Sequence, residues 1–292
     1  MTGRSSERPL SAQVAHVARQ EFLWLRRGWT VPTVTVLFTL AVVSVVRSAE
    51  PPGLGEQPLT LLALVPAGEA LSPTAVVTFT LGRMLTLLVP LVVVVLAAGT
   101  LAGDYQSGRL RTLQTLPVSR RAVVAGKLLT RASVVVGVVT LGLVVGAVTS
   151  WHRFGTVDPV EYGLFLLVSL VFTLSLTGTT VAVSTLASVR SRAVALSLGP
   201  LLIFAYLGVD PGIPAVLRTG LLVQPYQLLV AGTHDQLVAI PRVVLARQPT
   251  VSGWTRTIRT LVLSDEVSLG MLLAWPCTLL ALGLNRFHRR DL

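Results

Sequence analysis

The side chains best suited to metal or nucleophile chemistry are scattered along this sequence. Its four histidines show no ligand spacing; they are His16, His152, His234 and His288. Cys277 is the single cysteine, and it stands inside an apolar run, where it fits a packing role. It has no C-x-x-C partner. The sequence therefore predicts no metal centre and no disulfide framework.

Nucleotide hydrolysis would need a phosphate-binding loop. That loop has the pattern G-x-x-x-x-G-K-[ST], in which backbone N–H groups hold the phosphates. The only Gly-Lys pair is Gly126–Lys127, and it fails the pattern twice. Arg121 stands where the first glycine belongs, and Leu128 replaces the Ser or Thr. We therefore expect no cofactor and no ATPase site on this chain.

The composition indicates a membrane protein. Of the 292 residues, 13% are charged, about half of what a soluble domain carries, and the mean hydropathy is +0.73. The net charge of +11 comes from basic residues that lie between apolar runs. Such residues orient a chain in the bilayer and contact anionic headgroups, so nucleic-acid binding is not indicated.

Six apolar stretches are long enough to cross a bilayer as helices. They cover residues 29–46, 84–101, 132–150, 164–186, 193–209 and 267–284. They are too long, and alternate too little, for the strands of a membrane barrel. The predicted fold is an all-α polytopic membrane protein whose transmembrane domain spans residues 29–286.

The basic residues predict the orientation. With the N-terminus inside, roughly two thirds of the lysines and arginines fall on the cytoplasmic side, at about three times the density of the outer side. Both termini are then cytoplasmic, the short tail 287–292 included. The outer segments are 47–83, 151–163 and 210–266. In the last, the apolar stretch 213–231 is interrupted by polar residues, which indicates a re-entrant or surface helix.

The N-terminal segment 1–28 is expected to hold an interfacial amphipathic helix at Leu10–Arg27. Its apolar residues share one half of the helical wheel and its arginines the other, but Glu21 and Leu23 break the pattern. The alternative is a solvated tail.

The predicted spans contain no Asp, Glu, Lys or Arg at depth. Arg83 and Glu161 border the spans and can reach the interface. Ion-coupled carriers and intramembrane proteases need such groups or paired nucleophiles, so the energy for any transport must come from elsewhere. Two G-x-x-x-G pairs, Gly99–Gly103 and Gly142–Gly146, and the hydroxyls of the fourth span favour helix packing over a polar cavity.

The segment 102–131 is the most informative. Leu110, Leu113 and Leu116 recur every third residue, Pro117 breaks the chain, and Ser119 can cap a new helix. On that helix a basic stripe enters the third span, formed by Arg120, Lys127 and Arg131. An apolar strip beside a turn suits a docking site, although a solvated positive-inside loop has the same composition.

This segment resembles the signature region of ABC-2 type permeases. The matching residues are Asp104, Gly108, Leu113, Leu116, Pro117, Ser119, Arg120, Gly126 and Lys127. Asp104 stands where the family more often has Glu. The chain looks most similar to the branch named for multi-copper enzyme and nitrous oxide reductase maturation. The six-span layout, the leading interfacial helix and the basic C-terminus also fit.

The resemblance implies a permease subunit in a prokaryotic plasma (inner) membrane. It would form a homo- or heterodimer with a second permease and pair with separate ABC ATP-binding subunits, which hold the ATP and magnesium. Segment 102–131 would couple ATPase closure to the spans. The family resemblance does not give the substrate, and our hypothesis is export of an amphipathic, lipid-like, drug-like or sulfur-containing solute. Copper passage is disfavoured, because the spans carry few soft ligands (Met84, Met271 and Cys277). The alternative function is a non-transporting membrane scaffold or assembly factor.

Overall fold

The computed structural model describes residues 9–49, 72–107, 119–187, 189–207, 223–234 and 264–288. These residues are helical almost throughout, and no strand occurs among them. The helices are α1 (Leu10–Arg27), α2 (Thr30–Ser48), α4 (Pro73–Ala97), α5 (Thr100–Gln106), α7 (Arg120–Phe154), α8 (Pro159–Leu186), α9 (Arg190–Leu207), α11 (Val223–Gly232) and α14 (Asp265–His288). The predicted all-α class is confirmed.

Among the described residues, five helices are long and apolar enough to cross a membrane. They are α2, α4 with its continuation into α5, α7, α8 and the Asp265–Gly283 part of α14. The remaining predicted span, 193–209, corresponds to α9, which has Arg190 and Arg192 in its first turn. The chain is thus a polytopic membrane protein, and the count of six spans stays a prediction.

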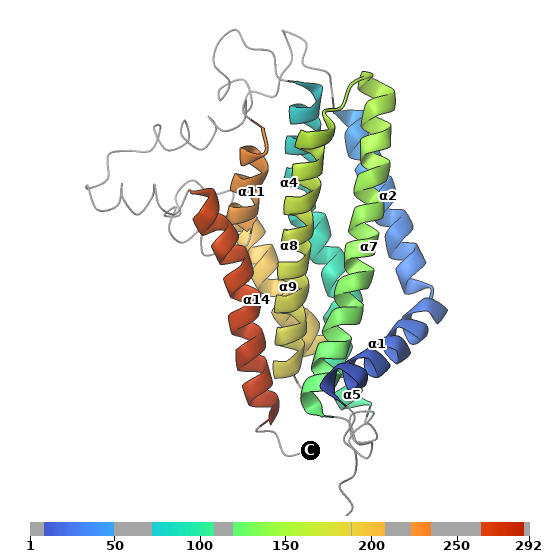
Figure 1. Ribbon diagram of the computed structural model, residues 1–292, viewed down its shortest axis with the longest axis vertical. Coiled ribbons are helices and arrows are strands. Elements are labelled where there is room, and N and C mark those ends of the chain that lie inside the picture. The colour runs from blue at the N-terminus through green and yellow to red at the C-terminus, as the bar shows by residue number, and fades with distance from the viewer. Residues whose placement is uncertain are drawn as a thin grey trace, which may run out of the picture.

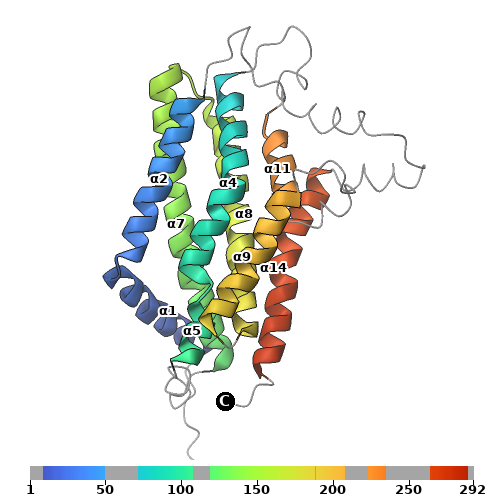
Figure 2. The ribbon, with the colours of Figure 1, turned by 180° about the vertical axis from the view of Figure 1, so that it is seen from behind.

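The helices form an elongated bundle with α1 lying across one end (Figures 1 and 2). We call this end, where α1, α5 and the start of α7 meet, the α1 end. The last turns of α14 also lie there, because Gly283 packs against Thr185 near the end of α8. The two ends of the described chain therefore lie at the same end of the bundle, as the predicted topology requires.

Side-chain caps mark the starts of α7 and α4. The Ser119 hydroxyl accepts a hydrogen bond from the Ala122 N–H (3.2 Å), so α7 begins where the sequence predicted. Ser72 caps α4 in the same way, with Pro73 in the first turn. Helix α4 therefore begins eleven residues before the predicted span 84–101, and residues 73–83 of the predicted outer segment 47–83 are helical. Arg83 lies inside α4 and not at its border.

The glycines of α7 make close helix packing possible. A Cβ atom on Gly142 would lie 2.5 Å from Phe38 of α2, and one on Gly146 would lie 2.8 Å from Val42. The packing interpretation of this pair is confirmed. Gly99 likewise packs against Arg190, whereas Gly103 has nothing within 4 Å of a Cβ position.

The hydroxyls of α8 are used in packing too. Ser184 accepts hydrogen bonds from the N–H groups of Leu101 and Ala102 at the bend between α4 and α5. Ser175 donates to the Leu272 carbonyl of α14 (2.5 Å). These bonds join α8 to its neighbours, which is the role that small polar residues have in membrane bundles.

The described part of the long outer segment is the ten-residue helix α11. At about 15 Å it is half as long as the hydrocarbon is thick, so it cannot cross. It packs into the bundle through Tyr226, which stacks on Phe172 (centroids 4.2 Å apart) and bonds to Ser169 (3.0 Å). His234, just after α11, contacts the Thr78 hydroxyl and lies 2.8 Å from Glu161. The rest of 210–266 lies mostly outside the described residues.

Candidate coupling site

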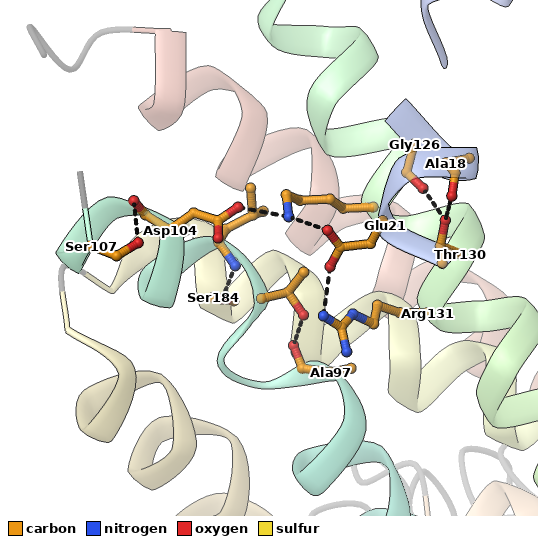
Figure 3. Close-up of polar contacts among 12 residues, drawn as sticks. Ala18, Glu21, Ala97, Asp104, Ser107, Gly126, Thr130, Arg131 and Ser184 are labelled. Carbon is orange, nitrogen blue, oxygen red and sulfur yellow. Dashed lines mark hydrogen bonds and ion pairs between the residues drawn. The ribbon is translucent and has the colours of Figure 1, made fainter. Parts of the chain in front are cut away.

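Four charged side chains from three helices meet at the α1 end (Figure 3). Lys127 of α7 lies between two carboxylates, 3.0 Å from Glu21 of α1 and 2.7 Å from Asp104 of α5. Arg131, one turn further along α7, lies 2.6 Å from the other oxygen of Glu21. Glu21 thus bridges both cations. We call these four residues the charge cluster.

The charge cluster is largely withdrawn from solvent. The Lys127 side chain is 3% exposed and that of Glu21 is 15% exposed. Arg131 also donates a hydrogen bond to the Leu96 carbonyl at the end of α4 (2.6 Å). Buried charges persist only when they are paired and hydrogen-bonded, and each of these has a partner. The cluster therefore requires α1, α5 and α7 to stay together.

The neighbouring cations also fix the ionisation of Glu21. Burial by itself raises the pKa of this carboxyl. The attraction of Lys127 and Arg131, and their hydrogen bonds, outweigh that effect and lower the pKa below its ordinary value. Glu21 is therefore anionic at neutral pH, and α1 carries a fixed negative charge into a basic surrounding.

Close packing accompanies the ion pairs. Val17 of α1 lies over Gly126 of α7, and Thr130 donates a hydrogen bond to the Ala18 carbonyl (3.0 Å). The Ser119 N–H donates to the Gln13 side chain (2.9 Å). Helices α1, α5 and the first three turns of α7 therefore form one unit, which we call the coupling block.

Replacing Gly126 by alanine should separate α1 from α7. The new Cβ would lie 2.8 Å from the Val17 Cβ and 3.0 Å from the Val14 carbonyl, a backbone atom that cannot rotate away. We expect a loss of about 1–3 kcal/mol in the free energy of unfolding in mixed micelles. Gly137→Ala on the same helix is the control, because nothing lies within 4 Å of its Cβ position. Equal effects of the two changes would contradict this packing.

The predicted site residues divide into two groups. Asp104, Ser119, Gly126 and Lys127 are described, and all four belong to the coupling block. Arg120 is the first residue of α7. The predicted residues Gly108, Leu113, Leu116 and Pro117 lie outside the described residues. The side chains of Lys127 and Arg131 are buried, so these two members of the predicted basic stripe do not face solvent. The role of all these residues in coupling stays a prediction.

Sequence reasoning missed Glu21 as a site residue. Glu21 is the single acid of α1 and interrupts its amphipathic pattern. The sequence held one signal for the Glu21–Lys127 pair: α1 has one acid among basic residues, and the chain has a single lysine.

The described residues form an all-α membrane bundle in which the amphipathic helix α1, lying across one end, is held to α7 by a buried ion-pair cluster. The family model of the ABC-2 family transporter proteins matches residues 15–292, and the chain belongs to this family. It is thus a membrane subunit of an ABC transporter. The maturation branch stays a prediction, and no curated protein matches the chain.

Proposed function

We propose that this chain is the permease subunit of an ATP-driven exporter. A separate ABC ATP-binding subunit supplies the energy, and the α1 end faces the cytoplasm of a prokaryotic cell. The charge cluster carries this proposal. It joins three helices around the two ends of segment 108–118, in which the family resemblance places the docking residues.

The coupling block can pass a displacement to two spans at once. Segment 108–118 is attached to α5 on one side and to α7 on the other. α5 continues from α4, and Arg131 holds the end of α4 through the Leu96 carbonyl. A movement that the ATPase imposes on this segment therefore reaches α4 and α7 together, with α1 bound to α7 through Glu21. ATP and magnesium stay on the partner subunit.

The test is co-purification with an ATP-binding subunit. Leu113→Ala should remove an apolar anchor from the ATPase groove and weaken association about tenfold or more. Arg120→Glu should act more strongly, because it adds like-charge repulsion. Membrane abundance should stay normal, since both residues lie outside the apolar part of the spans. Arg47→Glu, near the end of α2, is the control for a charge reversal far from the α1 end.

Two outcomes would contradict the proposal. Wild-type ATPase binding by both variants would show that 102–131 is only a positive-inside loop. Failure of any ATP-binding subunit to associate with the wild-type chain would favour the scaffold function.

A further inference from the structure

A break separates α4 from α5, although the local sequence does not require one. Residues 73–104 have the length and apolarity of one 32-residue span, yet α4 ends at Ala97 and α5 begins at Thr100. No proline lies between residues 96 and 104. Gly99 stands at the junction, but an isolated glycine is tolerated within a helix. The break must therefore be held by contacts with other parts of the protein.

Two N–H groups at the start of α5 are capped from another helix. In one continuous helix, the N–H groups of Leu101 and Ala102 would bond the carbonyls four residues earlier. Here both donate to the Ser184 hydroxyl of α8, at 3.1 and 3.2 Å. All three residues are buried, so water does not offer a replacement. Ser184 therefore stands in for two carbonyls of a continuous helix.

Two carbonyls at the end of α4 have side-chain partners. In a continuous helix they would accept from the N–H groups four residues later. Arg131 of α7 donates to the Leu96 carbonyl at 2.6 Å. The Thr100 hydroxyl donates to the Ala97 carbonyl, also at 2.6 Å. In Figure 3, Arg131 and Ser184 lie beside the turn that links the two helices, so the break is capped from α7 and from α8.

Helix α9 supports the bent form as well. The Arg190 N–H donates to the Gln106 side chain at the end of α5 (3.3 Å). The Arg190 side chain lies over Gly99, where a Cβ atom would come within 2.7 Å of its Nε. Bonds from α7, α8 and α9 thus hold the bent form, whereas a straight form would use the backbone bonds of the chain itself. Two arrangements that satisfy the same groups make a bistable element.

We propose that the α4–α5 junction is a two-state hinge and that Ser184 is a positioning residue for coupling. In the bent form, Ser184 and Arg131 cap the break. In the straight form, α4 and α5 are one helix, and α5 has left Ser184 and Lys127. Because Arg131 and Lys127 also belong to the charge cluster, a pull on segment 108–118 acts on the caps and the ion pairs together. This inference rests on the proposed function for its driving force.

Spin labels across the junction test the two states. In a Cys277→Ala background, labels are attached through Leu87→Cys and Ser107→Cys, both at exposed positions. Double electron–electron resonance then gives their distance in the full-length protein in phosphatidylcholine nanodiscs. Twenty residues of continuous helix place the two Cα atoms about 30 Å apart, and any bend shortens that distance. Ser184→Ala should raise the ratio of straight to bent protein about fivefold, as expected for the loss of a serine cap.

Further variants separate a hinge from a purely structural contact. Gly99→Ala should shift the ratio in the same direction, because alanine favours a continuous helix and its Cβ would meet the Arg190 side chain in the bent form. Ala98→Gly should shift it back toward the bent form, even in the Ser184→Ala chain, which a loss of stability alone would not produce. Ser175→Ala is the matched control. Its hydroxyl is as buried as that of Ser184 but bonds to α14, so the distance should not change.

The hinge and the proposed function fail separately, because the distances are measured without the ATPase. A wild-type distance in both Ser184→Ala and Gly99→Ala would overturn the hinge, and so would equal shifts in Ser184→Ala and Ser175→Ala. Ser184→Ala leaves segment 108–118 unchanged and should still co-purify with the ATP-binding subunit. An intact complex with an unresponsive junction would reject the hinge alone. A responsive junction in a chain that binds no ATPase would reject the energy source alone.

Discussion

Replacing Glu21 by alanine should lower the free energy of unfolding by on the order of 3 kcal/mol, the cost of removing one partner from a buried ion pair. Lys127 would keep Asp104, and Arg131 would keep only the Leu96 carbonyl. Both cations would stay buried beside the space left by the carboxylate. Unfolding in mixed micelles measures the effect, and Glu266→Ala, an exposed acid of α14, is the control.

A hydrophobic replacement separates stability from coupling. Well-packed apolar residues in place of a buried ion network often restore stability. The triple change Glu21→Leu, Lys127→Met and Arg131→Leu should therefore be more stable than Glu21→Ala. Transport should stay low in both, if the charges serve to keep α1, α5 and α7 in one register. Full transport by the triple variant would show that the cluster serves stability alone.

Truncating Tyr226 to alanine should detach α11 from the bundle. The ring is fully buried, stacked on Phe172 and bonded to Ser169, so its removal should cost about 3 kcal/mol or more. Tyr226→Phe keeps the stack and loses only the hydroxyl, for about 1 kcal/mol. Gln227→Ala changes the exposed neighbour and should stay within about 0.5 kcal/mol of wild type. Thermal unfolding of the purified variants gives the order, and equal effects at the two positions would contradict the packing.

Local chemistry in the sequence predicted several elements correctly. Leu10–Arg27 is helical as expected, because its arginines and apolar residues separate at a helical period. Ser119 marks the start of α7, because a serine before a helix satisfies an N–H group that has no intrahelical partner. These features depend on neighbours in the chain, so the sequence alone was enough to find them.

Other features were not predicted. The predicted span stops at Arg83, because a hydropathy window ends at the first charge, whereas helix α4 continues to Pro73. Ser72 and Pro73, eleven and ten residues earlier, carried the correct signal for the start of α4. Glu21 interrupts the amphipathic pattern of Leu10–Arg27 in the sequence. A helical wheel separates only the apolar and polar faces of one helix, so it cannot show that a buried cation on another helix pairs with this acid.

The charge cluster also sets an order of events during synthesis. Glu21 and Lys127 are 106 residues apart, so at about 5–20 residues per second the ribosome needs roughly 5–20 s to supply the cation after the acid. During that time α2 and α4 emerge while Glu21 still has no buried partner. The first described helix is thus locked in place only after α2, α4 and α5 have been made, and a nascent chain that stops before Lys127 leaves Glu21 without its buried cations.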